Sequence, residues 1–156
     1  MKATSFDHFY FHRSLASLLG RSYSLIFKRL ADYLKAQNLP ISADQFRILS
    51  ILWQKDGCSQ QNLAILSHRN RANITRHIDS LEHLGLVKRQ RDENDRRIYH
   101  IYLTEAGYAL EEQAVSCAKK AITEATQGIE QQELATCLKV LRQTIANFST
   151  GKSGTL

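Results

Sequence analysis

Residues 71–104 read RANITRHIDSLEHLGLVKRQRDENDRRIYHIYLT, and this stretch decides the fold. Its first half carries Ile74, Ile78 and Leu81 at a spacing that places them on one face of a helix. A glycine follows at position 85, where helices commonly end in the left-handed conformation that glycine adopts without strain. The pattern therefore predicts a helix that begins near Arg71 and ends just before this glycine.

The second half of the stretch is typical of a β-hairpin. Two β-forming runs, 86–91 and 98–103, flank the turn-forming segment Asp92–Asp95. Between residues 88 and 97, five side chains are Lys or Arg. The narrow tip of such a ribbon fits the minor groove of DNA, where the negative potential favours arginine. The alternative is a solvated hairpin with internal ion pairs, each contributing ~0–1 kcal/mol.

Upstream, the sequence predicts three helices. An amphipathic helix over about 10–37 ends before Pro40. Ser42 opens a second helix with a capping box, and Ser59 caps a short third helix that ends at a break over 67–70. A short helix, a tight break, a second helix and a basic hairpin form the arrangement of a winged helix-turn-helix.

Downstream, two more helices are predicted, one from Thr104 to Gly128 and one that carries a heptad-like apolar seam. The seam and the first helix have more apolar surface than one small winged lobe can cover, which indicates a partner. We therefore expect a mainly α chain with a small β-wing. The seam consists of Leu134, Leu138, Leu141, Ile145 and Phe148.

Composition narrows the class of protein. The chain has 156 residues, with 21 Lys and Arg against 15 Asp and Glu, so its net charge of +6 weakly favours a polyanionic partner. No apolar run approaches the ~20 residues needed to cross a bilayer, and charged residues interrupt the N-terminus, so we expect neither a membrane span nor a signal peptide. Three widely spaced cysteines favour the reducing cytoplasm.

The polar face at the start of the helix from residue 71 carries side chains that can read a major groove. Arginine can bond guanine, asparagine can bond adenine, and a threonine methyl can contact thymine, although an ordinary surface helix is the alternative. With the wing arginines, the candidate DNA-binding residues are Arg69, Arg71, Asn73, Thr75, Arg76, Arg96 and Arg97.

Residues 75–89 resemble the recognition helix and first wing strand of the MarR family of bacterial transcription regulators. The motif Asp95-x-Arg97, followed after five residues by Leu103-Thr104-x-x-Gly107, resembles that family's wing signature. Either motif alone is weak, but the two at this separation are specific. The helix order and the chain length are also similar to the family's over about residues 10–148.

The resemblance implies one MarR-like domain over residues 1–156 and an obligate homodimer. Helices from both termini, about 10–37 and 104–148, would form the dimerisation region, and about 42–103 the winged helix-turn-helix lobe. Residues 71–76 would enter the major groove and Arg97 the minor groove, with Asp95 orienting Arg97.

Members of this family bind pseudo-palindromic double-stranded DNA operators, often repress transcription, and often release DNA when a small aromatic effector binds. We therefore expect a cytoplasmic, sequence-specific transcription regulator, with a winged-helix protein-interaction module that has no operator as the alternative. Candidate walls of an effector pocket, each also explicable as core, are Tyr23, Phe27, Arg47, Trp53 and Tyr108.

No other chemistry is indicated. The sequence has no phosphate-binding loop, nucleophile elbow or zinc-protease motif, so we expect no enzyme, no cofactor and no metal site. His8 and His12 are spaced like zinc ligands on a helix, but nothing nearby completes a site. No cysteine precedes Cys58, so the arrangement by which some MarR relatives sense hydroperoxides is absent. Cys58 itself follows a turn that we expect to be exposed, beside a helix N-terminus, which would allow a redox role.

Overall fold

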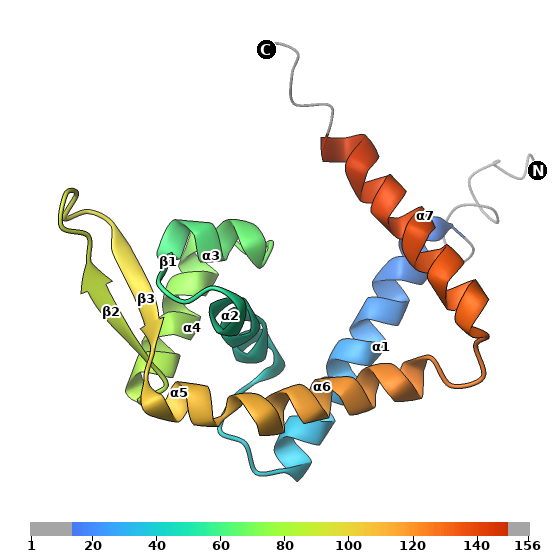
Figure 1. Ribbon diagram of the computed structural model, residues 1–156, viewed down its shortest axis with the longest axis horizontal. Helices are drawn as coiled ribbons and strands as arrows, with labels where there is room; N and C mark the ends of the chain where they lie inside the picture. The colour runs from blue at the N-terminus through green and yellow to red at the C-terminus, as the bar shows by residue number, and fades with distance from the viewer. Residues whose placement is uncertain (1–13, 150–156) are drawn as a thin grey trace, which may run out of the picture. The chain divides into compact units, whose positions relative to one another are not determined.

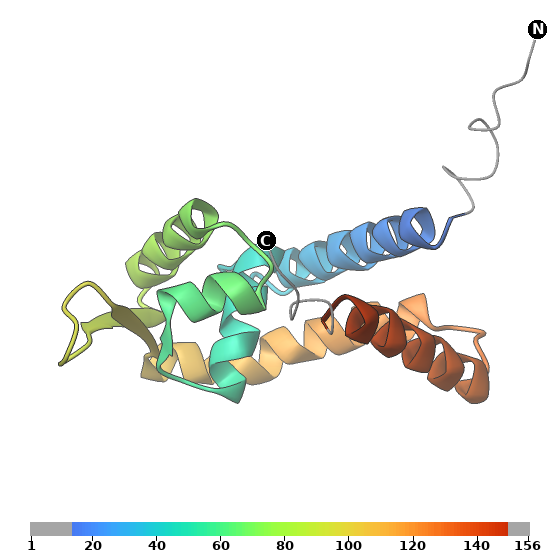
Figure 2. The ribbon, with the colours of Figure 1, turned by 90° about the horizontal axis from the view of Figure 1, so that it is seen from above.

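The computed structural model describes residues 14–149, which fold into helices and one small sheet (Figures 1 and 2). The chain divides into two compact units, residues 1–121 and residues 122–156. In chain order the elements are α1 (Leu15–Ala36), α2 (Ala43–Gln54), β1 (Cys58–Ser59), α3 (Gln60–Leu66), α4 (Arg71–His83), β2 (Val87–Arg91), β3 (Tyr99–Leu103), α5 (Glu105–Ala109), α6 (Glu111–Ala125) and α7 (Gln131–Ser149).

The helix α1 agrees with the helix predicted over about 10–37, as far as the described residues reach. The core takes Leu30 and Leu34 from its C-terminal end. Leucines of its N-terminal part remain exposed in the isolated chain: Leu15, Leu18, Leu19 and Leu25.

The capping box predicted at the start of α2 is confirmed. Ser42 Oγ accepts a hydrogen bond from the Gln45 N–H at 3.2 Å, and Gln45 Oε1 accepts one from the Ser42 N–H at 2.7 Å. The amide of Gln45 is buried and also donates to Ser80 Oγ at 2.9 Å. One side chain therefore starts α2 and ties it to α4.

The apolar face predicted for α4 is also confirmed. Ile74, Ile78 and Leu81 are fully buried, and Gly85 follows the helix with φ +69°. Side chains from α2, α3 and β3 close the same core: Ile48, Leu49, Leu52, Leu63 and Ile101.

The strands form one antiparallel sheet in the order β1–β3–β2. β2 and β3 make the predicted hairpin within one residue of the predicted runs, and Gln90 pairs with His100. The additional strand β1 pairs Cys58 with Ile101. It is absent from the prediction because two residues are too few to show an alternating pattern.

The prediction of one helix from Thr104 to Gly128 is wrong, because the chain forms α5 and α6 with a break at Leu110. Tertiary contacts hold α5. The Gly107 carbonyl accepts a hydrogen bond from the Trp53 indole N–H at 3.0 Å, and a Cβ on Gly107 would lie 2.2 Å from the Leu86 carbonyl oxygen. Contacts from distant residues thus override the local helical pattern.

In the second unit, α7 buries none of its described side chains. Its apolar residues include Leu138, Ile145 and Phe148, which are 43%, 66% and 82% exposed. The predicted seam therefore lies on a helix that the single chain leaves largely uncovered.

Candidate nucleic-acid interface

The N-terminal end of α4 carries its polar side chains at the surface. Asn70 caps the helix, since its Oδ1 accepts a hydrogen bond from the Asn73 N–H at 2.9 Å. Arg71 and Arg76 are exposed, and Asn73 and Thr75 are half-buried. No acidic residue lies in the first turn, so the positive end of the helix dipole and the two guanidinium groups favour an anion here.

Thr75 is already bonded inside the lobe. Its hydroxyl donates to the Arg71 carbonyl at 3.0 Å and accepts from Gln60 Nε2 at 2.5 Å. A base contact through this hydroxyl would compete with Gln60, whereas a methyl contact would not. Gln60, which the sequence analysis missed, connects α3 to α4 beside the predicted base-reading residues.

Arg69 is held differently from the other predicted cations. Its Nη2 pairs with Asp44 Oδ1 at 2.6 Å, between the break before α4 and the start of α2. Its Nε is buried without a hydrogen-bond partner. This pair therefore links the break before α4 to the start of α2.

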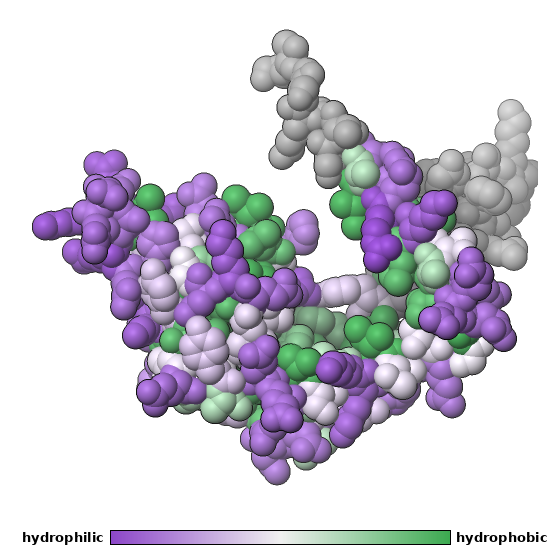
Figure 3. All heavy atoms as spheres, in the orientation of Figure 1, coloured by the Kyte–Doolittle hydropathy of each residue, from purple (hydrophilic) through white to green (hydrophobic). Residues whose placement is uncertain are grey.

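The tip of the β2–β3 hairpin exposes Arg96 and Arg97, and Figure 3 shows hydrophilic side chains gathered over this part of the surface. Asp95 Oδ1 accepts a hydrogen bond from the backbone N–H of Arg97 at 2.9 Å. The carboxylate of Asp95 therefore orders the backbone that presents Arg97. The contact that the structure shows is to this backbone N–H and not to the guanidinium.

The first wing strand is anchored to α4 by Arg89. Its guanidinium pairs with Asp79 and, at 2.6 Å, with Glu82, and its backbone N–H donates to Glu82 at 3.1 Å. Arg89 is therefore neutralised by the helix, although it lies among the five cations of the hairpin. A neighbouring cation, Arg91, lies over the Tyr99 ring at 5.6 Å.

The base of the wing explains the motif Leu103-Thr104-x-x-Gly107. The Thr104 hydroxyl donates to the Gly85 carbonyl at 2.6 Å and accepts from the Gly107 N–H at 3.1 Å. The Thr104 N–H donates to the Leu86 carbonyl at 3.1 Å. Thr104 therefore both caps α5 and closes the base of the hairpin. The Leu86 carbonyl approaches so closely that only glycine fits at position 107.

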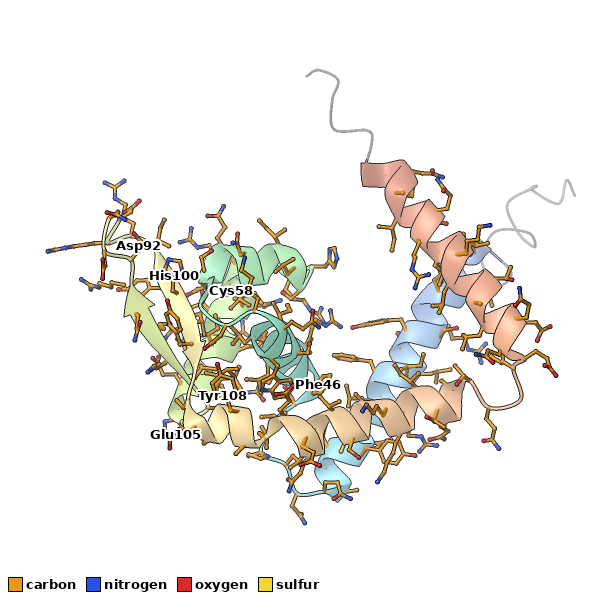
Figure 4. All side chains as sticks on the ribbon, viewed as in Figure 1. Phe46, Cys58, Asp92, His100, Glu105 and Tyr108 are labelled. Carbon is orange, nitrogen blue, oxygen red and sulfur yellow. The ribbon has the colours of Figure 1, made fainter. Side chains whose placement is uncertain are left out.

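A second polar network, missed by the sequence analysis, lies near the wing tip (Figure 4). His100 Nε2 is 2.9 Å from Asp92 Oδ2, and His100 Nδ1 is 2.9 Å from the Gly57 carbonyl oxygen. The Gly57 carbonyl and then Asp92 raise the pKa of His100 above its ordinary value. Backbone N–H groups of Asp95 and Asn94, and then His100, lower the pKa of Asp92.

Three of the five predicted effector-pocket residues lie together. The rings of Tyr23 and Phe27 stack with centroids 5.3 Å apart, and the Arg47 guanidinium lies 5.3 Å and 4.8 Å from these two centroids. Arg47 also donates to the Ser67 carbonyl at 3.2 Å. Burial, and then the neighbouring Arg69, lower the pKa of Arg47.

The other two predicted pocket residues make separate contacts. Trp53 donates to Gly107 and packs edge-on against Phe46 with centroids 5.8 Å apart. The Tyr108 hydroxyl donates to Asp56 Oδ2 at 2.9 Å, and this bond raises the pKa of Tyr108. Trp53 thus acts as a packing residue between α2 and α5.

The expectation of an exposed turn at Cys58 is wrong. Cys58 is buried on β1, and its thiol donates to the Lys55 carbonyl at 3.1 Å, because pairing with β3 draws it into the core. Within residues 14–149, no three His, Cys, Asp or Glu side chains come close enough to hold a metal ion. His8 and His12 lie outside the described residues.

The MarR family profile matches residues 41–99, which span α2 to the start of β3. The chain is 28% identical over 141 residues to the organic hydroperoxide resistance transcriptional regulator of Bacillus subtilis, with 90% of this chain and 95% of that protein covered. Residues 41–99 of this chain thus form a MarR-family domain, and the chain is a DNA-binding transcription regulator.

Solved MarR-family structures share this fold. A cysteine-to-serine variant of E. coli MarR complexed with operator DNA has a TM-score of 0.76 at 26% identity, covering 83% of this chain and 92% of that one. Bordetella bronchiseptica BpsR, whose DNA binding is regulated by 6-hydroxynicotinic acid, has a TM-score of 0.75 at 24% identity, covering 83% of this chain and 96% of that one. Within residues 14–149, no helix is long and apolar enough to span a membrane.

Proposed function

We propose that this chain acts as a homodimeric repressor in the cytoplasm, binding a pseudo-palindromic operator with one winged lobe per half-site. The observation that carries the proposal is the pairing, within one lobe, of an exposed basic helix start and an exposed arginine tip. Arg89 links the two through Asp79 and Glu82. A helix and a wing fixed to one another suit a major groove and its adjacent minor groove.

Roles follow from the observed contacts. Arg71, Asn73 and Arg76 would read or hold the major groove, and Thr75 would offer its methyl group. Arg96 and Arg97 would occupy the minor groove. Because its guanidinium is paired with Asp44, Arg69 would position α4 rather than read bases.

The dimer is supported by the uncovered apolar residues of α7 and of the N-terminal part of α1. Apolar surface of this kind is stabilised when a partner covers it. A twofold dimer would place its recognition helices about one turn of DNA, ~34 Å, apart. All 156 residues would then serve as one MarR-like domain, with the winged lobe between the dimerisation helices.

A small aromatic anion is the effector class that fits the cluster of Arg47, Tyr23 and Phe27. The stacked rings offer an apolar surface, and the guanidinium above them offers a charge partner for a carboxylate. BpsR responds to 6-hydroxynicotinic acid, which has this chemistry. Hydroperoxide sensing is not proposed for this chain, because no cysteine precedes Cys58 and Cys58 itself is buried.

The test is selection of bound duplexes from a random-sequence pool by the purified protein, repeated with 6-hydroxynicotinic acid present. The proposal predicts an enriched sequence with two inverted half-sites, and affinity that falls steeply with salt because Arg contacts release counterions. A lobe that enriches no sequence would instead support a protein-interaction module. If 6-hydroxynicotinic acid does not change the affinity for DNA, the proposed effector class is excluded, whereas the proposal of operator binding is unaffected.

A further inference from the structure

His100 lies on the central strand with both ring nitrogens facing oxygens that can only accept hydrogen bonds. One is the Gly57 carbonyl, and the other is the carboxylate of Asp92, each at 2.9 Å. A neutral imidazole has a single N–H and can donate only one of these bonds, whereas an imidazolium donates both. The arrangement is therefore complete only when the ring is protonated.

The two bonds join both outer strands to β3 near the wing tip. Gly57 directly precedes β1, and Asp92 directly follows β2. The glycine is required there, because its φ is +70° and a Cβ would lie 2.7 Å from the Tyr102 ring. A larger residue in the same backbone conformation would be strained and would have to displace the Tyr102 ring.

From Asp92 the network continues into the tip itself. Its second carboxylate oxygen accepts hydrogen bonds from the N–H groups of Asn94 and Asp95, both at 2.9 Å. Asp95 in turn holds the backbone N–H of Arg97. A continuous series of bonds therefore runs from Gly57 through His100 to the backbone that presents the tip arginines.

The surroundings leave Asp92 as the carboxylate in contact with the ring. Gln90 on β2 and Ser59 on β1 pair with His100, and both are uncharged. Asp56, which directly precedes Gly57 in the sequence, already accepts hydrogen bonds from the Leu103 N–H and the Tyr108 hydroxyl. By strand alternation the ionisable groups on the face of His100 are Lys88, Asp92 and Tyr102, and those on the opposite face are Arg89, Arg91 and Tyr99.

Building on the proposed DNA-binding function, we propose that His100 is a proton-dependent clamp that orders the wing tip, so that DNA affinity falls as the pH rises and the ring loses its proton. His100 is a positioning residue, which acts on DNA through Asp92 and Asp95. Its pKa is raised in the folded chain, so the clamp is complete below the ordinary value and is lost as the pH rises through the raised one. The wing would then bind DNA best in mildly acidic conditions.

The first experiment needs no DNA. Long-range ¹H–¹⁵N NMR of the free protein reports the protonation of each histidine ring as the pH changes. We expect the His100 ring to carry a proton on both nitrogens at about pH 6.5, the ordinary value for histidine, and to lose one of them only at higher pH. A His100 ring that is neutral at this pH would overturn the clamp.

The second experiment measures affinity for a duplex selected from the random-sequence pool, between about pH 6 and about pH 8.5. The wild-type chain should lose about two- to fivefold more affinity over this range than His100→Gln, a modest effect because exposed ion pairs contribute little. The matched control His83→Gln should keep the wild-type slope. Equal slopes for wild type and His100→Gln would contradict the proposal.

The variant Asp92→Asn tests the clamp from the other side, because it should hold the neutral form of His100 in place. The amide oxygen can still accept from Asn94 and Asp95, while the amide N–H can donate to the lone pair of a neutral His100. This variant should therefore keep its affinity at high pH and show a flattened slope. If the wild-type protein enriches no DNA at any pH, the proposed function fails, whereas DNA binding with a slope unaltered in both variants refutes only the clamp.

Discussion

The winged lobe and α7 solve the problem of apolar burial in different ways. In the lobe, Ile74, Ile78 and Leu81 are fully covered by the chain's own side chains. In α7, Ile145 and Phe148 remain 66% and 82% exposed. The lobe can therefore order its DNA-reading surface by itself, whereas α7 needs a covering partner, which a second copy would supply.

Breaking the proposed contact of α7 should give the largest effect. Ile145→Asp places a charge on the seam of both protomers. Burial of one such side chain contributes ~1.5–3 kcal/mol, and a twofold interface counts it twice, so dimerisation should weaken by ~3–6 kcal/mol. Analytical ultracentrifugation checks this, with Glu133→Gln on the same helix as a control. An Ile145→Asp protein with an unchanged sedimentation profile would remove α7 from the interface.

A substitution in the core of the lobe should have a nearly equal effect, but on the free energy of unfolding instead of on dimerisation. Ile78→Ala removes a fully buried side chain and leaves a cavity, so the free energy of unfolding should fall by ~2–5 kcal/mol. Urea denaturation followed by circular dichroism measures the loss. Glu133→Gln, at an exposed polar position of α7, should change the free energy of unfolding far less, and equal losses for the two variants would contradict the assignment of Ile78 to the core.

Arg97→Ala tests the role of the wing tip at the DNA surface. Removing a guanidinium that inserts in the minor groove should weaken operator binding by ~1–3 kcal/mol. Arg91→Ala is the matched control, because Arg91 is already occupied over Tyr99 and should matter less. Fluorescence anisotropy with the selected duplex measures both, and equal affinities for Arg97→Ala and wild type would exclude the minor-groove role.

The smallest effect is expected at the anchor between wing and helix. Arg89→Ala removes the partner of Asp79 and Glu82 at a partly exposed site, so operator affinity should fall by about 1 kcal/mol or less. The salt dependence of binding should stay the same, since Arg89 is not assigned a phosphate contact. A reduced salt slope would instead assign Arg89 to the DNA.

Local patterns in the sequence predicted much of this lobe. The capping box at Ser42, the buried face of α4 and the glycine stop at Gly85 each depend on residues within a few positions of one another, and all are confirmed. The wing strands were found for the same reason. Short-range chemistry therefore located the helix and hairpin that carry the candidate site.

The features that were missed depend on contacts between distant residues. β1 exists because Cys58 pairs with Ile101, and α5 is separate from α6 where Trp53 reaches Gly107. The clamp joins Gly57 to His100 across 43 positions in the sequence. No local period or spacing marks such pairs. The assignment of Cys58 to an exposed turn was therefore wrong, because pairing with Ile101 buries Cys58 in the core.

Selection of duplexes from a random pool, with the mass of the bound complex measured by light scattering, tests dimerisation and DNA reading together. Two protomers on one enriched sequence, with inverted half-sites about one helical turn apart, are expected if α7 or α1 joins the copies and each lobe reads one half-site. A folded monomer that binds every duplex equally well would contradict this picture.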